Sequence, residues 1–253
     1  MTRIVFLHIP KTAGQTVHSE LSRIVGVDKT SPIRVHTQAT SPAQYPEGYS
    51  LYSGHLDWDQ LQTGIPDQFI FTILRDPFER IASFYFYLKH KALTLTEDQI
   101  TQPQNSGMRT VRNWSADDYF FGGDTAWQRF ILDHYDNFYC SYLATRKVRG
   151  SAALCQLSQA DVLACAHRAA LRLDGIYDIA NLSPLEDDIH RLTGQRPNIV
   201  GTRINSGPAS SEPNRWHALL QCLERDANRQ RLHDFARTDA ALIRRLAADG
   251  LLR

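Results

Sequence analysis

The first sixteen residues carry side chains that could bind an anion. Lys11 follows an apolar run of β-forming residues, Ile4 to Ile9, and precedes a segment, Gln15 to Ile24, whose pattern is typical of a helix. A short loop at a helix N-terminus collects free backbone N–H groups and the positive end of the helix dipole. Lys11 adds a mobile positive charge there, and Thr12 and Thr16 add hydroxyl donors. The spacing predicts a phosphate or sulfate site, against the alternative of a solvated lysine in an ordinary turn.

A second cation stands where another strand meets a helix. Phe69 to Leu74 is a continuous apolar run suited to the centre of a parallel sheet, and Arg75 follows it directly. Asp76 as N-cap, Pro77 at the first helical position and Glu79 at the third predict a helix start with a capping box. Arg75 could bind a second anion, or it could form an ion pair with Asp76 or Glu79.

The helix that begins there continues to about Lys91 and has one apolar face. Its members recur at the spacing i, i+3, i+4 and i+7 and are expected to pack on the sheet. They are Ile81, Phe84, Tyr85 and Leu88. Ser83 lies off that face, so its hydroxyl group can face a site, unless it is an inert small residue at a helix–sheet contact.

Strand-like and helix-like segments alternate along the rest of the chain. Further strands are expected at Tyr49–Ser53 and Gly175–Ile179, with one shorter strand at Ile33–His36. Further helices are expected at Thr125–Tyr135, Ser158–Leu173, Pro184–Leu192 and, in two or three pieces, Arg215–Leu246. This alternation predicts an α/β fold with a central parallel sheet flanked by helices.

The length of the chain fits one domain over residues 1–253 with a single sizeable core. Residues 94–124 are expected to be irregular, because they show no clear periodicity, and such a long segment inside a compact domain is typical of a functional lid or of partial disorder. A helical C-terminal part is expected from about residue 215.

Composition excludes several classes of protein. Lys and Arg number 28 and Asp and Glu 27, so the chain lacks the global basic field that binds nucleic acid. No apolar stretch approaches the length of a membrane span, and the run near the start is too short for a signal peptide, so a cytoplasmic protein is expected. The four cysteines have no metal-ligand spacing, and no metal is expected.

Two stretches resemble motifs of the sulfotransferases that use 3′-phosphoadenosine 5′-phosphosulfate (PAPS). His8-Ile-Pro-Lys-Thr-Ala-Gly14 resembles their 5′-phosphosulfate loop, and Leu74-Arg-Asp-Pro-Phe-Glu-Arg-Ile-Ala-Ser-Phe-Tyr85 resembles their 3′-phosphate motif. The residues of these motifs are most similar to those of carbohydrate sulfotransferases of the heparan sulfate 2-O-sulfotransferase type and their short bacterial relatives. The resemblance implies their three-layer, P-loop-like fold, and it is faint after Thr125.

The resemblance implies a role for each matching residue. Lys11 would contact the 5′-phosphosulfate and neutralise charge on the bridging oxygen as the sulfuryl group leaves. Arg75 and Ser83 would hold the 3′-phosphate, and Arg203 lies where the family often places a loop over the nucleotide. Further donors to the 5′ group would come from Thr12, Ala13, Gly14, Gln15 and Thr16.

His55, in Tyr52-Ser-Gly-His-Leu56, stands where the 2-O-sulfotransferase type carries its base. An acceptor hydroxyl is a poor nucleophile at pH 7, so a base with a pKa near 7 suits the reaction, and histidine is the usual choice. A structural histidine at a strand end is the alternative, and His8 or His36 could take the role of base. His8 is expected to pack beneath the loop.

The resemblance also implies the reaction. PAPS would donate its sulfuryl group by in-line transfer, leaving 3′-phosphoadenosine 5′-phosphate (PAP), with lysine and amide donors serving without a metal. The expected acceptor is a hydroxyl on a saccharide or glycoconjugate, with a hydroxyl on a small metabolite as the alternative. A P-loop kinase is disfavoured because the glycine-rich phosphate-binding pattern is absent. An inactive nucleotide-binding module is disfavoured because both Lys11 and His55 are present.

Overall fold

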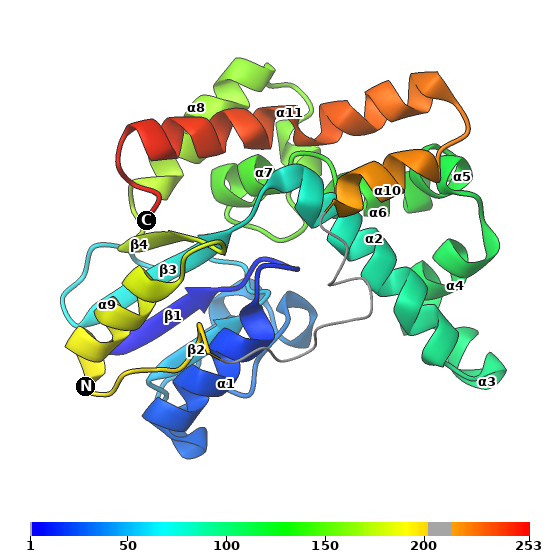
Figure 1. The fold of residues 1–253 in the computed structure, drawn as a ribbon. Coiled ribbons are helices and arrows are strands. Elements are labelled where there is room, and N and C mark those ends of the chain that lie inside the picture. Colours follow the sequence, from blue (N-terminus) through cyan, green and yellow to red (C-terminus); the bar gives the residue numbers. More distant parts are fainter. Residues whose placement is uncertain (1, 202–213) are drawn as a thin grey trace. The chain divides into compact units, whose positions relative to one another are not determined.

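A computed structural model describes residues 2–201 and 214–253 (Figure 1). Contacts divide the chain into two compact units. The first, called the sheet unit here, holds residues 2–75, 139–201 and 238–253 of the described chain. The second, called the helical unit, holds residues 76–138 and 214–237. The single domain expected over residues 1–253 stays a prediction.

The sheet unit is built on four parallel strands. They are β1 (Arg3–Leu7), β2 (Leu51–Gly54), β3 (Gln68–Leu74) and β4 (Gly175–Asp178), in the order β2-β1-β3-β4. Val5 of β1 faces Tyr52 of β2 and Ile70 of β3, so β1 pairs on both of its sides. The predicted α/β fold with a central parallel sheet is therefore confirmed.

Helices cover both faces of this sheet (Figure 1). Alternate strand residues, among them Phe6 and Phe71, pack on α1 (Gly14–Val25) and α9 (Ser183–Thr193), which contribute Leu21 and Ile189 to the same core cluster. The opposite face carries α7 (Phe138–Thr145), α8 (Gln159–Ala170) and the C-terminal part of α11 (Asp226–Ala248). The strands are rich in buried β-branched and aromatic residues, and helices pack on both faces of the sheet. Sheet and helices form the three layers that the sequence predicts.

The helical unit has a core of its own. It contains α2 (Pro77–Thr94), α3 (Glu97–Ile100), α4 (Ser106–Asn113), α5 (Ala116–Phe121), α6 (Thr125–His134), α10 (Arg215–Gln221) and the first part of α11. Its buried cluster includes Tyr85, Tyr119, Phe120 and Tyr135, and the Tyr119 and Tyr135 hydroxyls hydrogen-bond at 2.8 Å. Several of these aromatic rings meet at steep angles, the edge-to-face arrangement that aromatic pairs favour.

The expectation that the apolar face of α2 packs on the sheet is wrong. Ile81, Tyr85 and Leu88 are buried in the cluster of the helical unit, among residues of other helices. Periodicity shows that a helix has a face to bury, but it does not show which element will cover that face. Here residues of α4, α5 and α10 belong to the same cluster, and the Tyr119 and Phe120 rings of α5 contact the ring of Tyr85.

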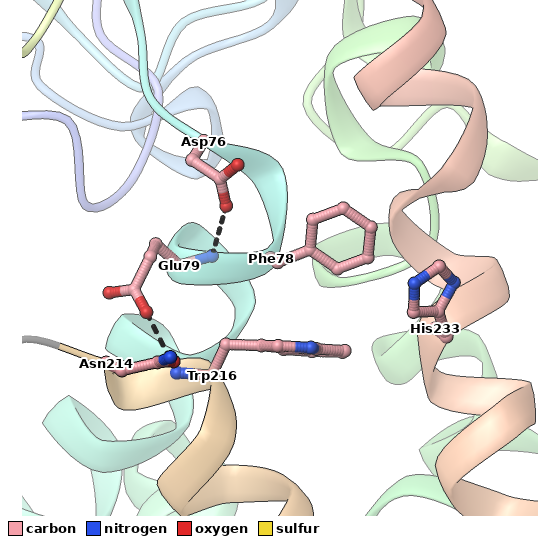
Figure 2. Close-up of a pocket in the computed structure, with 6 residues that line it drawn as sticks. All are labelled: Asp76, Phe78, Glu79, Asn214, Trp216 and His233. Atoms are coloured by element: carbon pink, nitrogen blue, oxygen red, sulfur yellow. Dashed lines mark hydrogen bonds between the residues drawn. The ribbon is translucent and has the colours of Figure 1, made fainter.

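The start of α2 follows the prediction in part. The Asp76 carboxylate accepts the backbone N–H of Glu79 at 2.9 Å, as the N-cap should. The Glu79 carboxylate reaches α10, where it accepts the N–H of Trp216 at 2.9 Å (Figure 2). Asp76 and Glu79 line an open pocket of about 350 Å³ in the helical unit, together with Phe78, Trp216, His233 and Asn214.

The expectation of irregular structure over residues 94–124 is also wrong. The segment holds α3, α4 and α5, and Thr96 and Ser115 cap two of these helices with their hydroxyl groups. Each helix is too short to show a clear period, yet Ile100 and Val111 are buried in the core. A lid function for this segment stays a prediction.

Candidate functional site

The candidate site lies where three neighbouring strands of the sheet unit end. The residues that follow β2, β1 and β3 are His55, His8 and Arg75, respectively. From β1 the chain passes to β2 on one side and later to β3 on the other, so the direction of winding changes beside β1. Parallel α/β sheets bind ligands outside the carboxyl ends of their strands at such a switch point.

The loop after β1 has a constrained backbone. Lys11 and Ala13 have φ angles of 72° and 63°, in the left-handed region that residues other than glycine seldom adopt. The fully buried Thr12 donates its hydroxyl hydrogen to the carbonyl oxygen of Ile9 at 2.8 Å. This hydrogen bond closes the loop, and donation by the Thr12 hydroxyl to a ligand stays a prediction. Strained backbone of this kind tends to occur at functional sites.

The loop ends at the start of α1, which offers unused donors. Within this fully described helix, Ala13 makes no side-chain cap and the first turn contains no acidic residue. The first N–H groups of a helix have no acceptor inside the helix, so those of Gly14 and Gln15 point out of its end. With the lysine of the loop beside them, these groups suit an oxyanion.

Gly14 is required because a buried ring lies against it. A Cβ atom at Gly14 would come within 1.7 Å of Nε2 of His8, whose ring is 6% exposed and stacks on Phe6 at 5.2 Å. His8 thus packs beneath the loop, where the sequence places it. The glycine allows the start of α1 to approach the end of β1.

Replacing Gly14 with alanine is expected to lower the free energy of unfolding by about 1–3 kcal/mol, the usual effect of an overpacked core. Urea denaturation measures this loss. His8→Ala makes room for the new methyl group, so the same Gly14→Ala change should be less destabilising in a His8→Ala background. Equal losses in the two backgrounds would show that His8 is not the residue that excludes a side chain.

His55 has a defined protonation pattern. Its Nδ1 lies 2.6 Å from the carbonyl oxygen of His8. A carbonyl oxygen only accepts hydrogen bonds, so Nδ1 must carry the proton, and the lone pair of the neutral ring is on Nε2. Burial lowers the pKa of His55 below its ordinary value, the bond to His8 opposes that shift, and Arg34 and His36 add to it. The ring is therefore neutral at pH 7.

Among the described residues, the side chains that shift the pKa of His8 and His55 are all basic. Burial holds the pKa of His8 well below its ordinary value, and electrostatic interaction with the basic groups of His55, Arg34, His18 and Lys11 lowers it further. Burial and all four neighbouring groups lower the pKa of His8. A site made of lysine, arginine, histidine and backbone N–H groups can hold an anionic phosphosulfate, so the donor set fits PAPS.

Arg75 is held by a tyrosine from a distant part of the sequence. The Tyr139 hydroxyl donates to the Arg75 carbonyl oxygen at 2.9 Å and lies 3.2 Å from the Arg75 N–H, which donates to it. Tyr139 is itself fixed by Asp239, whose carboxylate accepts the N–H groups of Tyr139 and Cys140 at 2.9 and 2.8 Å. The backbone at the end of β3 is thus anchored to α7 and, through it, to α11.

Tyr139→Phe is expected to destabilise the protein by about 1–3 kcal/mol, because two backbone groups of Arg75 lose a buried partner. It is also expected to weaken PAP binding several-fold, since Arg75 is then less well positioned. Thermal denaturation and titration calorimetry measure the two effects. Tyr177→Phe is the matched control, because that buried hydroxyl binds Asp188 and should affect stability but not PAP affinity. Unchanged PAP affinity in Tyr139→Phe would contradict the positioning role.

The structure brings together only some of the predicted site residues. Lys11 and the residues from Thr12 to Thr16 lie in one loop and helix start of the sheet unit, with His8 and His55 beside them. Arg75 follows the adjacent strand of the same unit. Ser83 is buried in α2 of the helical unit. Arg203 lies outside the described residues.

Sequence reasoning missed three residues at this edge. Arg34 and His18 hydrogen-bond to each other beside the loop, and Tyr139 holds Arg75. Arg34 falls in a segment predicted as a short strand, but only Val35 forms a bridge there, with His55. The sequence offers one signal for His18, which lies one turn after Gly14 in a predicted helix. Side chains of a helix lean toward its N-terminus, so the His18 side chain is directed toward the loop.

The described residues lack two kinds of feature. None of their helices is both long enough and apolar enough to cross a membrane. Within the same residues, no three His, Cys, Asp or Glu side chains gather where they could hold a metal ion.

Comparison with known proteins identifies the family. No curated protein matches the chain. The sequence model of the sulfotransferase family matches residues 2–131, which are just over half of the chain and include the loop, His55, Arg75 and Ser83. The chain therefore belongs to the sulfotransferase family and is a sulfuryl-transferring enzyme.

Proposed function

We propose that the enzyme takes its sulfuryl group from PAPS and releases PAP. The loop after β1 would bind the 5′-phosphosulfate through Lys11 and through backbone N–H groups between Thr12 and Thr16. Arg75, together with Ser83 of α2, would bind the 3′-phosphate. Support comes from the donors gathered at the edge of the sheet unit, where every described side chain that shifts the pKa of His8 is basic. Sulfotransferases as a family use this donor, which agrees with the proposal.

His55 is the proposed base, and its contact with His8 is the observation that carries the proposal. Because the carbonyl of His8 holds the Nδ1 proton, the free lone pair is on Nε2. The lowered pKa of His55 keeps that lone pair available at pH 7. In the reaction the acceptor hydroxyl gives its proton to Nε2 while its oxygen attacks the sulfur, and Lys11 stabilises the charge on the oxygen that leaves.

The proposed acceptor is a hydroxyl on a saccharide or glycoconjugate. Its support is the similarity of the loop and of the Gly-His stretch around His55 to carbohydrate sulfotransferases. A hydroxyl on a small metabolite is the second candidate acceptor. The proposed binding site of the 5′-phosphosulfate and the proposed base would lie close together, since the ring centroids of His8 and His55 are 4.4 Å apart and His8 contacts the start of α1. Either acceptor could be placed between them.

Incubation with ³⁵S-labelled PAPS tests the donor and the acceptor together. The purified enzyme would be offered a panel of neutral and acidic oligosaccharides and, separately, phenolic and alkyl alcohols. Label is expected on at least one saccharide, and it should appear far more slowly with the His55→Asn variant. Label on the small alcohols alone would overturn the saccharide part of the proposal. Label on an acceptor from the His55→Asn variant at the wild-type rate would overturn the role of the base.

A further inference from the structure

Arg34 carries a positive charge that the described part of the chain does not neutralise. Its guanidinium group donates a hydrogen bond to Nε2 of His18, and burial with the charge of Arg34 lowers the pKa of His18 to about 4, so that partner is neutral. Within residues 2–201 and 214–253, no carboxylate pairs with Arg34, and its Nε–H group is buried without a hydrogen-bond partner. A partly buried charge without a counter-charge is unfavourable unless a ligand supplies one.

The backbone fixes Arg34 directly beside the proposed base. Its carbonyl oxygen accepts the N–H of His55 at 2.8 Å, and the N–H of His36 donates to the carbonyl oxygen of His55 at 2.8 Å. This approach is so close that a Cβ atom at Gly54 would lie 2.2 Å from the Arg34 carbonyl oxygen. A glycine before the histidine is therefore needed to let the Arg34 segment run alongside β2.

The side chain extends from this position toward the loop. Its partner His18 is on α1, one turn beyond Gly14, and the positive charge of Arg34 acts on both His8 and His55. His8 contacts the start of α1, where the phosphosulfate is proposed to bind. His55 is the proposed base, so the acceptor hydroxyl is proposed to lie beside it. The guanidinium group thus lies near the path between donor and acceptor.

We propose that Arg34 binds oxygens of the sulfuryl group as that group moves from the Lys11 loop to the acceptor hydroxyl at His55. The inference rests on the proposed function. The planar guanidinium fork matches a tetrahedral oxyanion, and charge in such transfers is spread over the equatorial oxygens. As the bond between sulfur and the 5′-phosphate oxygen breaks, that oxygen keeps the electron pair and PAP leaves. The new bond forms to the acceptor oxygen, and the hydroxyl proton moves to Nε2 of His55. His18 positions the guanidinium group and does not touch the sulfur.

The comparison of PAPS with PAP isolates this contact, because the two differ only in the sulfuryl group. Titration calorimetry would give the Kd of each for the wild type, Arg34→Gln and Arg34→Lys. Arg34→Gln is expected to weaken PAPS binding about tenfold or more, the size of one hydrogen bond to a charged group, and to leave PAP binding within about twofold. Arg34→Lys keeps the charge without the fork, so it should weaken PAPS binding less, and it carries the test if the glutamine variant does not fold. Arg23→Gln is the matched control, an exposed arginine of the sheet unit paired with Glu20, and should change neither Kd.

Three results would overturn the inference. One is that PAPS binding and PAP binding weaken equally, which would show that Arg34 contacts the nucleotide part that both ligands share. The second is an unchanged Kd for both ligands. The third is a higher KM for the acceptor with an unchanged Kd for PAPS, which would place Arg34 on the acceptor. If the wild type binds neither PAPS nor PAP, the proposed function itself fails, and that outcome is distinct from all three.

Discussion

Replacing His55 with asparagine is expected to lower kcat by about 10²- to 10⁴-fold, the usual contribution of a general base. Asparagine is the informative substitution because its side-chain NH₂ group can still donate to the carbonyl of His8, as Nδ1 does. The fold should therefore be kept while the lone pair of Nε2 is lost. Steady-state kinetics with saturating PAPS measures the change, and the Kd for PAP should stay within about twofold of the wild type.

The pH dependence gives a second readout of the same residue. The base must be neutral, so kcat/KM rises with pH through the pKa of His55 and is level above it. Because burial lowers that pKa, the rise is expected below the ordinary histidine value of 6.5, and activity should be nearly constant from pH 7 upward. In His55→Asn the rise should disappear. An unchanged acid limb in the variant would show that another group titrates.

Replacing Lys11 with alanine is expected to lower kcat by about 10²- to 10³-fold, as the loss of one electrostatic donor to a developing charge does. The effect on PAP binding should be smaller, about tenfold or less, because the charge on the leaving oxygen is greatest in the transition state. Alanine keeps the Cβ atom, and Ala13 shows that this residue type adopts the left-handed φ that Lys11 has. The loop should therefore keep its shape.

Lys29→Ala is the control for that experiment. Lys29 is an exposed lysine of the sheet unit, and its removal changes the net charge of the chain by the same amount. Its kcat and its Kd for PAP should equal those of the wild type. If Lys11→Ala lowered PAP affinity and kcat by equal factors, Lys11 would be a ground-state ligand of the nucleotide and not the stabiliser of the leaving group.

The sequence was sufficient for elements whose signal is local. β1, β3 and the loop between β1 and α1 are encoded by continuous apolar runs that end at Pro10 and Arg75, and the structure has them with small shifts of their bounds. The parallel sheet follows from the alternation of strands and helices. His55 and the loop could be placed at the same edge for the same reason, since the ends of neighbouring parallel strands meet there.

The parts that could not be predicted depend on contacts between distant residues. Tyr139 reaches Arg75 across 64 positions, and His18 meets Arg34 across 16. The local pattern places His18 near the loop but does not indicate which distant residue it or Tyr139 contacts. The apolar face of α2 was visible, but part of its cover comes from α4 and α5, two helices too short to give a clear periodic signal.

The central claim is that the chain binds a nucleotide with anionic groups at both its 5′ and 3′ positions. A thermal-shift comparison of PAP, ADP and ATP, each with and without Mg²⁺, tests it most directly. PAP is expected to raise Tm strongly, ADP and ATP much less, and Mg²⁺ should make no difference to the PAP result. A larger rise with ATP plus Mg²⁺ than with PAP would contradict the account.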